Sequence, residues 1–368
     1  MKNGCDADFA LHDLSRVRLL NASTSDIEAV RGQLGFDPSP VQGQAAITLR
    51  FVPSLESNKT LRLVALGESA FSEDAFFLLS SRHRKTRIQL PLATIGEPCE
   101  IICETGLTAV PLLIPILNLT IFYQHRVVPL HASAFIYKGK GVLVTGWSKG
   151  GKTESLLSFM RNGASYIGDE WVYISADGKR LYGIPEPIRV WDWHLKSAPD
   201  LSSKIKGKDL TRLNATKAAI KAGRWIQHTG MPFASTARRS LPILSRSTYV
   251  DVKPAQLFGK LTPMKGPFDR LLFLVSHNSP KIEVLPISGL EVANRMVFSL
   301  AYERQTLLRY YLQFRFAFPE RHNPRIDTAD TLQLKQLKHL FSGKDAHIVS
   351  HPYPVSLASL YSAIEPVL

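Results

Sequence analysis

Cysteine is scarce in this sequence, which limits the kinds of site that it can form. The three cysteines in 368 residues are Cys5, Cys99 and Cys103. Cys99 and Cys103 form a CxxxC pair without histidines at the spacing of a zinc site, so we do not expect a metal cluster there. Low cysteine usage also fits a reducing cytosol, and we expect a cytoplasmic protein.

Long apolar runs are also lacking. Residues 1–20 contain aspartates and arginines and no continuous apolar stretch, so they do not have the pattern of a signal peptide. Residues 107–123 carry no charge, but they fall short of the ~20 residues of a membrane-spanning helix and include Pro111, Pro115 and Asn118. We expect a buried helix that begins near Pro111, and no transmembrane segment.

Acidic residues are fewer than basic ones, and much of the excess lies in one segment. The chain has 45 lysines and arginines against 31 aspartates and glutamates, a formal net charge of +14. Residues 196–246, the basic insertion, hold eleven Lys/Arg side chains against Asp200 and Asp209. This segment should attract an acidic substrate, an acidic protein partner or nucleotide phosphates. A solvated surface insertion is the alternative. An anionic membrane surface is a further alternative. Nucleic acid is not the expected partner, because no recognised nucleic-acid module accompanies the charge.

The sequence has neither a GxSxG elbow nor an HExxH motif, but it does contain a phosphate-binding motif. Residues 146–153, GWSKGGKT, fit GxxxxGK[ST]. Residues 141–145 predict a buried strand that leads into this loop. Residues 154–161 predict a helix that leaves it, with Gly163 as the stop signal. Strand, glycine loop and helix together are typical of a P-loop.

The loop residues predict how a nucleotide is held. Glycines let backbone N–H groups approach phosphate oxygens, and the helix N-terminus adds partial positive charge. Lys152 would reach the β- and γ-phosphates, and the Thr153 hydroxyl would hold Mg²⁺. We therefore predict ATP and Mg²⁺ as cofactors. The residues predicted to bind the nucleotide are Gly146, Ser148, Lys149, Gly150, Gly151, Lys152, Thr153 and Glu154.

Two adjacent carboxylates follow soon after the loop. Residues 166–174 predict a strand that carries Asp169 and Glu170, and Asp169 lies only 17 positions after Lys152. Adjacent side chains on a strand point to opposite faces, so we expect the two carboxylates to have different roles. One would face the γ-phosphate and the other the metal or the core. An exposed acidic turn before a strand is the alternative.

Several of these segments occur in an order that resembles the HPr kinase/phosphorylase-like proteins. The resemblance covers about residues 128–190: HASAF at 131–135, GVLVTG at 141–146, the P-loop, and GDE at 168–170. HPYPV at 351–355 is similar to the closing segment of such proteins. The superfamily contains kinases that act on a serine in a carrier protein, on free serine or on peptides, and its nucleotide core is similar to that of the phosphoenolpyruvate carboxykinases.

The resemblance implies roles for individual residues. His131 would lie near the transferred phosphate, Lys152 would contact the phosphates, and Asp169 would be the general base that accepts the substrate hydroxyl proton. Thr153 and Glu170 would hold Mg²⁺. The family usually has two consecutive aspartates where this chain has Asp169 and Glu170, so the chain departs from the family by one methylene at Glu170.

The chain also departs from the family at a later strand. Carrier-protein kinases have a Glu-x-Arg-Gly signature, whereas here Glu186 and Arg189 stand at a different spacing, between and after prolines. The phosphorylase half of the family's activity is therefore not expected. Arg189 would stabilise the charge on the transferring phosphoryl group, with a surface arginine at a strand edge as the alternative.

The rest of the pattern divides the chain in two. Short apolar and alternating runs separated by turns predict a β-rich N-terminal region over residues 1–125, partly helical up to residue 35. Residues 126–368 would form the P-loop domain, which includes the basic insertion. The predicted later elements are strands at 270–275, 281–285 and 346–349 and helices at 214–225, 290–316, 331–341 and 356–364.

These observations predict an α/β fold: an HPr kinase-like P-loop core with a mixed sheet, a β-rich N-terminal region and a helical C-terminal part. The function predicted is an ATP- and Mg²⁺-dependent kinase that phosphorylates a hydroxyl, in a protein or peptide serine or in a small molecule, with Asp169, Lys152, His131 and Arg189 as catalytic residues. The alternatives are a nucleotide-binding regulatory or assembly protein with little catalysis and an NTPase associated with nucleic acid. Relatives that form rings make a homo-oligomer an expectation by analogy.

Overall fold

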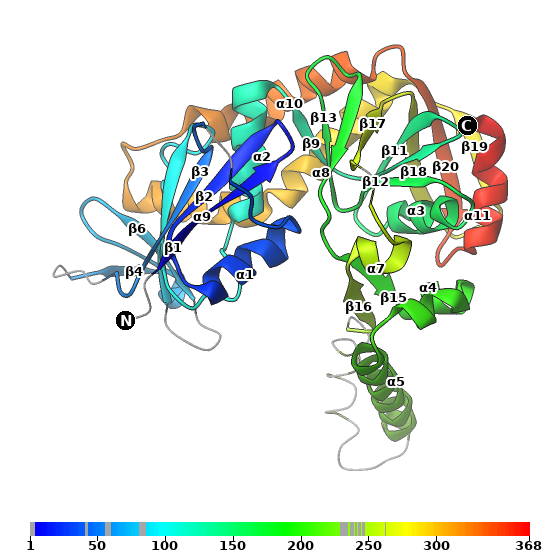
Figure 1. Cartoon of the computed structure of the whole chain (residues 1–368), viewed down its shortest axis with the longest axis horizontal. Coiled ribbons are helices and arrows are strands. Elements are labelled where there is room, and N and C mark those ends of the chain that lie inside the picture. The colour runs from blue at the N-terminus through cyan, green and yellow to red at the C-terminus, as the bar shows by residue number, and fades with distance from the viewer. Residues whose placement is uncertain are drawn as a thin grey trace.

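A computed structural model describes residues 4–40, 43–55, 60–80, 86–228, 235, 239, 241, 244, 247–261 and 263–368. Within these ranges the chain is mixed α/β and combines several sheets with helices (Figure 1). No helix among the described residues has the length and apolar character that a bilayer crossing requires.

The N-terminal region is built on an eight-stranded sheet, which confirms its predicted β-rich character. The strand order is β1-β2-β3-β8-β7-β6-β5-β4, with the β2–β3 and β3–β8 pairs parallel and the others antiparallel. The strands are β1 (Cys5–Leu11), β2 (Ser15–Ala22), β3 (Ile47–Val52), β4 (Arg62–Val64), β5 (Ser69–Phe71), β6 (Phe76–Ser80), β7 (Thr86–Gln89) and β8 (Cys99–Glu104), with the 3-10 turn η1 (Ala65–Gly67) after β4. Alternate residues of β3 are buried, as a sheet with one face on the core requires.

Two helices, α1 (Thr24–Leu34) and α2 (Leu113–His125), belong to the N-terminal region. In α1, Ser23 and Asp26 form a capping box and Gly35 ends the helix in a left-handed conformation. The predicted apolar helix is α2, which is buried at Leu113 and over residues 116–122 and exposed at its C-terminal end. The same core contains Leu307 and Tyr311 from near the other end of the chain.

The loop motif lies on a second, six-stranded mixed sheet. Its order is β12-β10-β11-β18-β20-β19, in which β11, β18 and β20 are parallel neighbours and the remaining pairs are antiparallel. Its strands are β10 (Ser133–Tyr137), β11 (Lys140–Gly146), β12 (Ser165–Gly168), β18 (Arg270–His277), β19 (Glu283–Pro286) and β20 (Asp345–Pro352). Helices α3 (Lys152–Met160) and α11 (Leu357–Ile364) pack together beside it, followed by the short turn η3 (Glu365–Val367).

Two smaller sheets complete the fold. One has the order β17-β14-β13-β9 and comprises β9 (Val128–His131), β13 (Trp171–Ile174), β14 (Arg180–Gly183) and β17 (Lys265–Pro267). The other pairs β15 (Ile188–Trp191) with β16 (Tyr249–Val252).

The single strand predicted over residues 166–174 is wrong, because the structure has two strands there, β12 and β13. The chain leaves the six-stranded sheet after β12 and enters the four-stranded sheet at β13, and Asp169 and Glu170 stand at the break. Glu170 takes a left-handed backbone conformation (φ 65°), which turns the chain there. The rule that neighbouring strand residues face opposite ways therefore does not apply to this pair.

The single helix predicted over residues 290–316 is two helices. α8 (Gly289–Glu303) and α9 (Gln305–Ala317) meet at Arg304, whose buried side chain donates hydrogen bonds to Gln333 and Asp330. These acceptors lie on α10 (Pro324–Phe341), which starts seven residues before the predicted helix at 331–341. The predicted last strand and last helix are confirmed as β20 and α11.

The basic insertion leaves the body of the molecule. After β15 come α4 (Asp192–Ser197), η2 (Pro199–Lys204) and α5 (Gly207–His228), and the chain returns through β16 and α7 (Pro254–Phe258). The elements from α4 to α7 are called the arm. Figure 1 shows α5 at the far end of the arm, beyond β15 and β16. Two of the eleven cations counted in the sequence, Arg238 and Arg246, lie outside the described residues.

Candidate functional site

The glycine loop, residues 146–151, runs from the end of β11 to the first turn of α3. Gly146 (φ 150°) and Gly151 (φ 96°) have torsions that L side chains rarely adopt. A Cβ atom on Gly146 would lie 2.5 Å from the carbonyl oxygen of Leu274, and one on Gly151 would lie 2.4 Å from Nε2 of His351. Neither position has room for a side chain, so both glycines are required by the path of the loop.

His351 holds the loop against the sheet. Its buried imidazole, on β20, places Nε2 2.9 Å from the carbonyl oxygen of Gly150 and Nδ1 2.8 Å from that of Pro352. The C-terminal HPYPV segment, which the sequence linked to the loop only through a resemblance, is therefore in direct contact with it.

Lys152 begins α3 with a buried ammonium group. Its Nζ donates a hydrogen bond to the carbonyl oxygen of Trp147 at 2.9 Å. Burial lowers the pKa of Lys152, while the charges of Glu170 and Asp169 act in the opposite direction. The cation and the first N–H groups of α3 make this end of the cavity attractive to an anion.

Asp169 faces the first turn of the same helix. The side chain is 2% exposed and accepts a hydrogen bond from Oγ1 of Thr153, 3.1 Å from its Oδ2. Burial, together with repulsion from Glu170, raises the pKa of Asp169 from 3.8 to about 7. A carboxylate with this pKa can exchange a proton near neutral pH, as a general base must.

The oxygen atoms at this end of the cavity have the chemistry that Mg²⁺ prefers. Mg²⁺ is usually bound through one or two carboxylates together with substrate phosphates and water. Thr153, Asp169 and Glu170 offer one hydroxyl and two carboxylates, so they fit this pattern. Across the described ranges, no group of three or more His, Cys, Asp or Glu side chains could hold a metal ion. Mg²⁺ at this position would therefore take further ligands from phosphates and water.

His131 bridges two carboxylates beside this oxygen cluster. Its Nε2 lies 2.9 Å from Oε2 of Glu170, and its Nδ1 lies 2.6 Å from Oε1 of Glu303. Burial and the charge of Lys152 work against protonation, but the hydrogen bonds with Glu170 and Glu303 outweigh them and raise the pKa of His131. With a carboxylate on each ring nitrogen, the imidazolium form satisfies both contacts. Burial opposes ionisation of Glu170, but the hydrogen bond with His131 and the charge of its imidazole lower the pKa of Glu170.

Glu154 is held by the arm and does not point freely into the cavity. Its Oε1 lies 2.9 Å from Nε2 of His194 and accepts a hydrogen bond from Nε1 of Trp193 at 3.3 Å. Burial opposes ionisation, but the bond with His194 lowers the pKa of Glu154. The predicted nucleotide-binding residue thus joins α3 to α4, and any contact with a nucleotide would come from its backbone N–H.

Arg189 lies at the rim of the cavity on β15. Its side chain is 46% exposed, forms an ion pair with Asp251 at 3.3 Å and lies over the Tyr249 ring at 4.3 Å. Beside it, the Trp191 ring faces Nζ of Lys149 across 5.8 Å. Arg189 is therefore near the phosphate end of the cavity, while part of its charge is already paired.

These side chains enclose one cavity of about 270 Å³. All the predicted site residues line it except Gly146, which lies at the start of the loop. Asp169 and Glu170 line it together, contrary to the expectation that they face opposite ways. The lining residues that were not predicted are Trp191, His194, Glu303 and Tyr353.

Only one of these four had a signal in the sequence. Tyr353 belongs to the HPYPV segment quoted for the resemblance. Glu303 lies 172 positions after His131, and α8 brings it back to the site, so no local pattern could have linked the two. Trp191, at the end of β15, and His194, on α4, lie just before the basic insertion, and no local pattern marks them as site residues.

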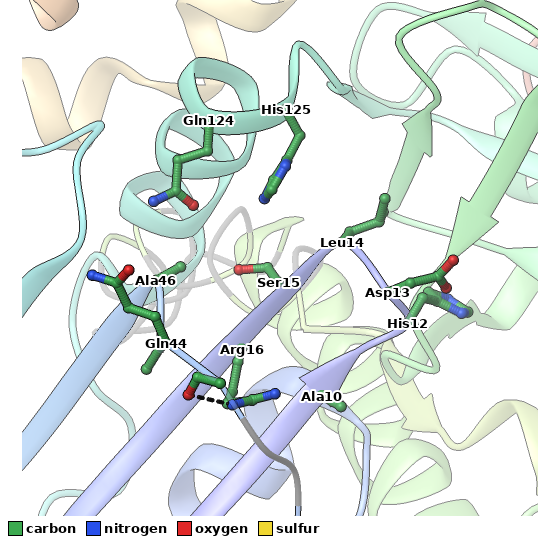
Figure 2. Close-up of a pocket in the computed structure, with 12 residues that line it drawn as sticks. Ala10, His12, Asp13, Leu14, Ser15, Arg16, Gln44, Ala46, Gln124 and His125 are labelled. Carbon is green, nitrogen blue, oxygen red and sulfur yellow. Dashed lines mark hydrogen bonds between the residues drawn. The ribbon is translucent and has the colours of Figure 1, made fainter.

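A larger hollow of about 630 Å³ lies in the N-terminal region (Figure 2). It is lined by the β1–β2 turn, residues 43–46 just before β3 and the end of α2. Figure 2 shows Ser15, Gln44, Gln124 and His125 directed around it. None of the loop residues lines it, and its polar groups do not form an acid–base pair with a phosphate-binding element. We therefore assign the candidate site to the smaller cavity.

Comparison of the sequence with protein-family models and with curated proteins finds no match.

Proposed function

We propose that this protein is an ATP- and Mg²⁺-dependent kinase that transfers the γ-phosphoryl group to a hydroxyl. The observation that carries the proposal is Asp169. A buried carboxylate with a pKa of about 7 lies beside the hydroxyl of Thr153, at the end of a glycine loop that ends in a helix N-terminus. A site that only holds a nucleotide has no need of a base at this position.

Each group has a role in this proposal. The loop N–H groups and Lys152 hold the phosphates, and Thr153 and Glu170 are placed to hold Mg²⁺. Asp169 takes the proton from the attacking hydroxyl. His131 fixes Glu170 and Glu303 and adds positive charge next to the transferring group. Bound Mg²⁺ would supply the charge neutralisation that phosphoryl transfer requires.

The fold is consistent with an HPr kinase-like core, which we propose on the resemblance given above. A β9–β10 segment that carries His131, a parallel strand into the loop, a single helix and then two carboxylates occur here in that order. The spacing of Glu186 and Arg189 departs from the carrier-protein signature, so we propose kinase activity without phosphorylase activity.

The test compares ATP binding and phosphoryl transfer in the wild type, Lys152→Ala and Asp169→Asn. Acceptors would be water, free serine and a cell extract. We expect Lys152→Ala to lose ATP binding, and Asp169→Asn to keep ATP binding and lose at least about 100-fold in transfer, the low end of the contribution of a general base. Lys179→Ala, an exposed lysine in the turn after β13, at the end of that strand away from His131, serves as the charge control.

The alternative is a nucleotide-binding regulatory protein with little catalysis. It would be favoured by tight ATP binding, no turnover with any acceptor and no effect of Asp169→Asn. That outcome would overturn the kinase proposal and leave the assignment of the loop intact.

A further inference from the structure

The arm carries a hollow of its own, of about 300 Å³, close to the phosphate cavity. Four cations and one acid line it, together with Ile220 and Thr248: Lys196 on α4, Lys217, Lys221 and Arg224 on α5, and Asp192. This set is called the basic hollow. Its charged lining is strongly positive, so an anionic group would enter it favourably.

The acid of the basic hollow is already neutralised. Oδ2 of Asp192 lies 2.9 Å from Nζ of Lys196, and its Oδ1 lies 2.5 Å from Nζ of Lys217. Burial opposes ionisation, but the hydrogen bonds with the two lysines lower the pKa of Asp192, so it stays charged. In the part of the chain that the structure describes, Lys221 and Arg224 have no ion-pair partner. Their charge is left for a ligand.

The basic hollow adjoins the candidate site through α4. Trp191 and His194 line the phosphate cavity, while Asp192, between them in sequence, lines the basic hollow. His194 is in turn bonded to Glu154 on the loop helix. The two cavities therefore lie on either side of one helical turn, and they share no lining residue.

We propose that the basic hollow docks acidic side chains of a polypeptide that presents its hydroxyl to Asp169. The proposal rests on the proposed kinase function and specifies its substrate class. Because the hollow is separate from the phosphate cavity, a small acceptor bound at Asp169 could not also fill it, whereas a polypeptide can span both. A compact cluster around one small hollow suits carboxylate side chains better than the continuous row of phosphates in a nucleic acid.

The same helix offers a matched control. Lys208 and Arg212 lie nine residues before Lys217 and Lys221, which is two and a half helical turns, so they fall on the opposite side of α5. Both are exposed, and neither lines the basic hollow. The pair Lys208→Glu/Arg212→Glu makes the same charge change as Lys221→Glu/Arg224→Glu, away from the proposed docking site.

The experiment measures binding of a fluorescein-labelled peptide in which a central serine is flanked by glutamates, by anisotropy with the full chain. The peptide with glutamines in place of the glutamates is the reference ligand. We expect the glutamate peptide to bind more tightly and Lys221→Glu/Arg224→Glu to weaken it about tenfold or more, because like charges are then placed together. The control pair should change the dissociation constant by less than about threefold, through long-range attraction alone.

Three outcomes would overturn the proposal. These are equal weakening by both double variants, equal affinity for the two peptides, and tighter binding of a single-stranded oligonucleotide or of anionic lipid vesicles through the same two cations. ATP binding, measured on the same samples, separates this inference from the kinase proposal. If ATP is bound and turned over while the glutamate peptide is not preferred, only the docking surface is wrong. If no turnover occurs and the peptide still binds at the basic hollow, the kinase proposal fails together with the substrate role of the peptide, and the docking surface itself stands.

Discussion

Oγ1 of Thr153 lies 3.1 Å from Oδ2 of Asp169, so the first turn of α3 is hydrogen-bonded to the break between β12 and β13. Thr153, one of the two residues proposed to hold Mg²⁺, is therefore in direct contact with Asp169, the residue proposed as base.

The burial of Asp169 beside Glu170 predicts how activity depends on pH, because burial and the charge of Glu170 raise the pKa of Asp169 while the bond from Thr153 lowers it. The raised pKa of Asp169, about 7, means that the base is protonated in acid, so phosphoryl transfer should rise with pH and level off above about pH 8. A pH–rate profile with saturating ATP would measure the rise. Asp169→Asn should have low activity with no step near pH 7, and an unchanged step in that variant would show that another group titrates.

The same shift makes a prediction about stability. Because folding raises the pKa of Asp169 from 3.8 to about 7, the folded state holds this proton more tightly than the unfolded chain. Asp169 therefore contributes stability below about pH 4 that is lost as the pH rises to about 7. We expect Asp169→Asn to unfold at a higher temperature than the wild type at about pH 8 and to lose this advantage in acid. Calorimetry across this range without nucleotide checks the sign, and a wild-type advantage at high pH would contradict it.

His131 should stabilise the fold when its imidazole is protonated and therefore positively charged. Its pKa is raised, so its contribution is complete below the ordinary histidine pKa of 6.5 and is lost as the pH rises through the folded-state value. His131→Gln leaves Glu170 and Glu303 without their shared cation and should cost about 1–3 kcal/mol in acid, less than breaking a fully buried pair, because the Glu170 side chain is 37% exposed and partly screened by solvent.

Urea unfolding near pH 6 and near pH 9 would compare His131→Gln with the wild type. The deficit should shrink at the higher pH. The double variant His131→Gln/Glu303→Gln is the control, because it removes one of the two carboxylates as well and should recover part of the loss. A deficit that is the same at both pH values would mean that the imidazole acts by packing alone.

Gly151→Ala tests the close packing of the loop. A Cβ atom there would lie 2.4 Å from Nε2 of His351, and the backbone torsion (φ 96°) is one that alanine rarely adopts. We therefore expect the variant to lose ATP binding and about 1–3 kcal/mol of folding stability, the cost of overpacking. Gly163→Ala is the matched variant, because it has a similar torsion (φ 87°) with nothing within 4 Å. It should lose stability through backbone strain and keep ATP binding. Equal losses of ATP binding in both would show that contact with His351 is unimportant.

The His194–Glu154 pair predicts coupling between the arm and the loop helix. His194→Ala leaves the buried Glu154 carboxylate without its main partner, and the cost should be about 3–5 kcal/mol. Hydrogen exchange would locate the effect, with faster exchange expected in both α4 and α3. His277→Ala, a partly exposed histidine on β18, is the control and should leave both helices unchanged.

The loop, its strand and its helix could be predicted because their signals are local. Residues 141–161 carry an apolar run, a glycine motif and a helix stop signal in direct succession. The strand positions of the N-terminal region were partly predictable for the same reason, since alternation is a property of neighbouring residues. The first hairpin, β1 and β2, was not, because residues 5–22 mix charged and apolar side chains without a clear period.

What the sequence did not predict depends on contacts between distant segments. Glu303 reaches His131 only because α8 ends at Arg304, and that end is set by hydrogen bonds to α10. Asp169 and Glu170 share one cavity because the chain changes sheets between them, a choice made by pairing with β9 and β10. Such long-range pairing leaves no periodic pattern at the residues themselves.

The sharing of the N-terminal core with α9 and α10 affects the order in which the protein can form during translation. Leu307 and Tyr311 fill that core, and the side chain of Asn323 donates hydrogen bonds to the carbonyl oxygens of Leu92 and Ile95. Until the ribosome has released residues 307–329, the eight-stranded sheet has an uncovered apolar face. The nascent chain must therefore hold this sheet incomplete while the glycine loop, the two carboxylates and the arm are synthesised. During this period, chaperones that recognise exposed apolar strands would bind here.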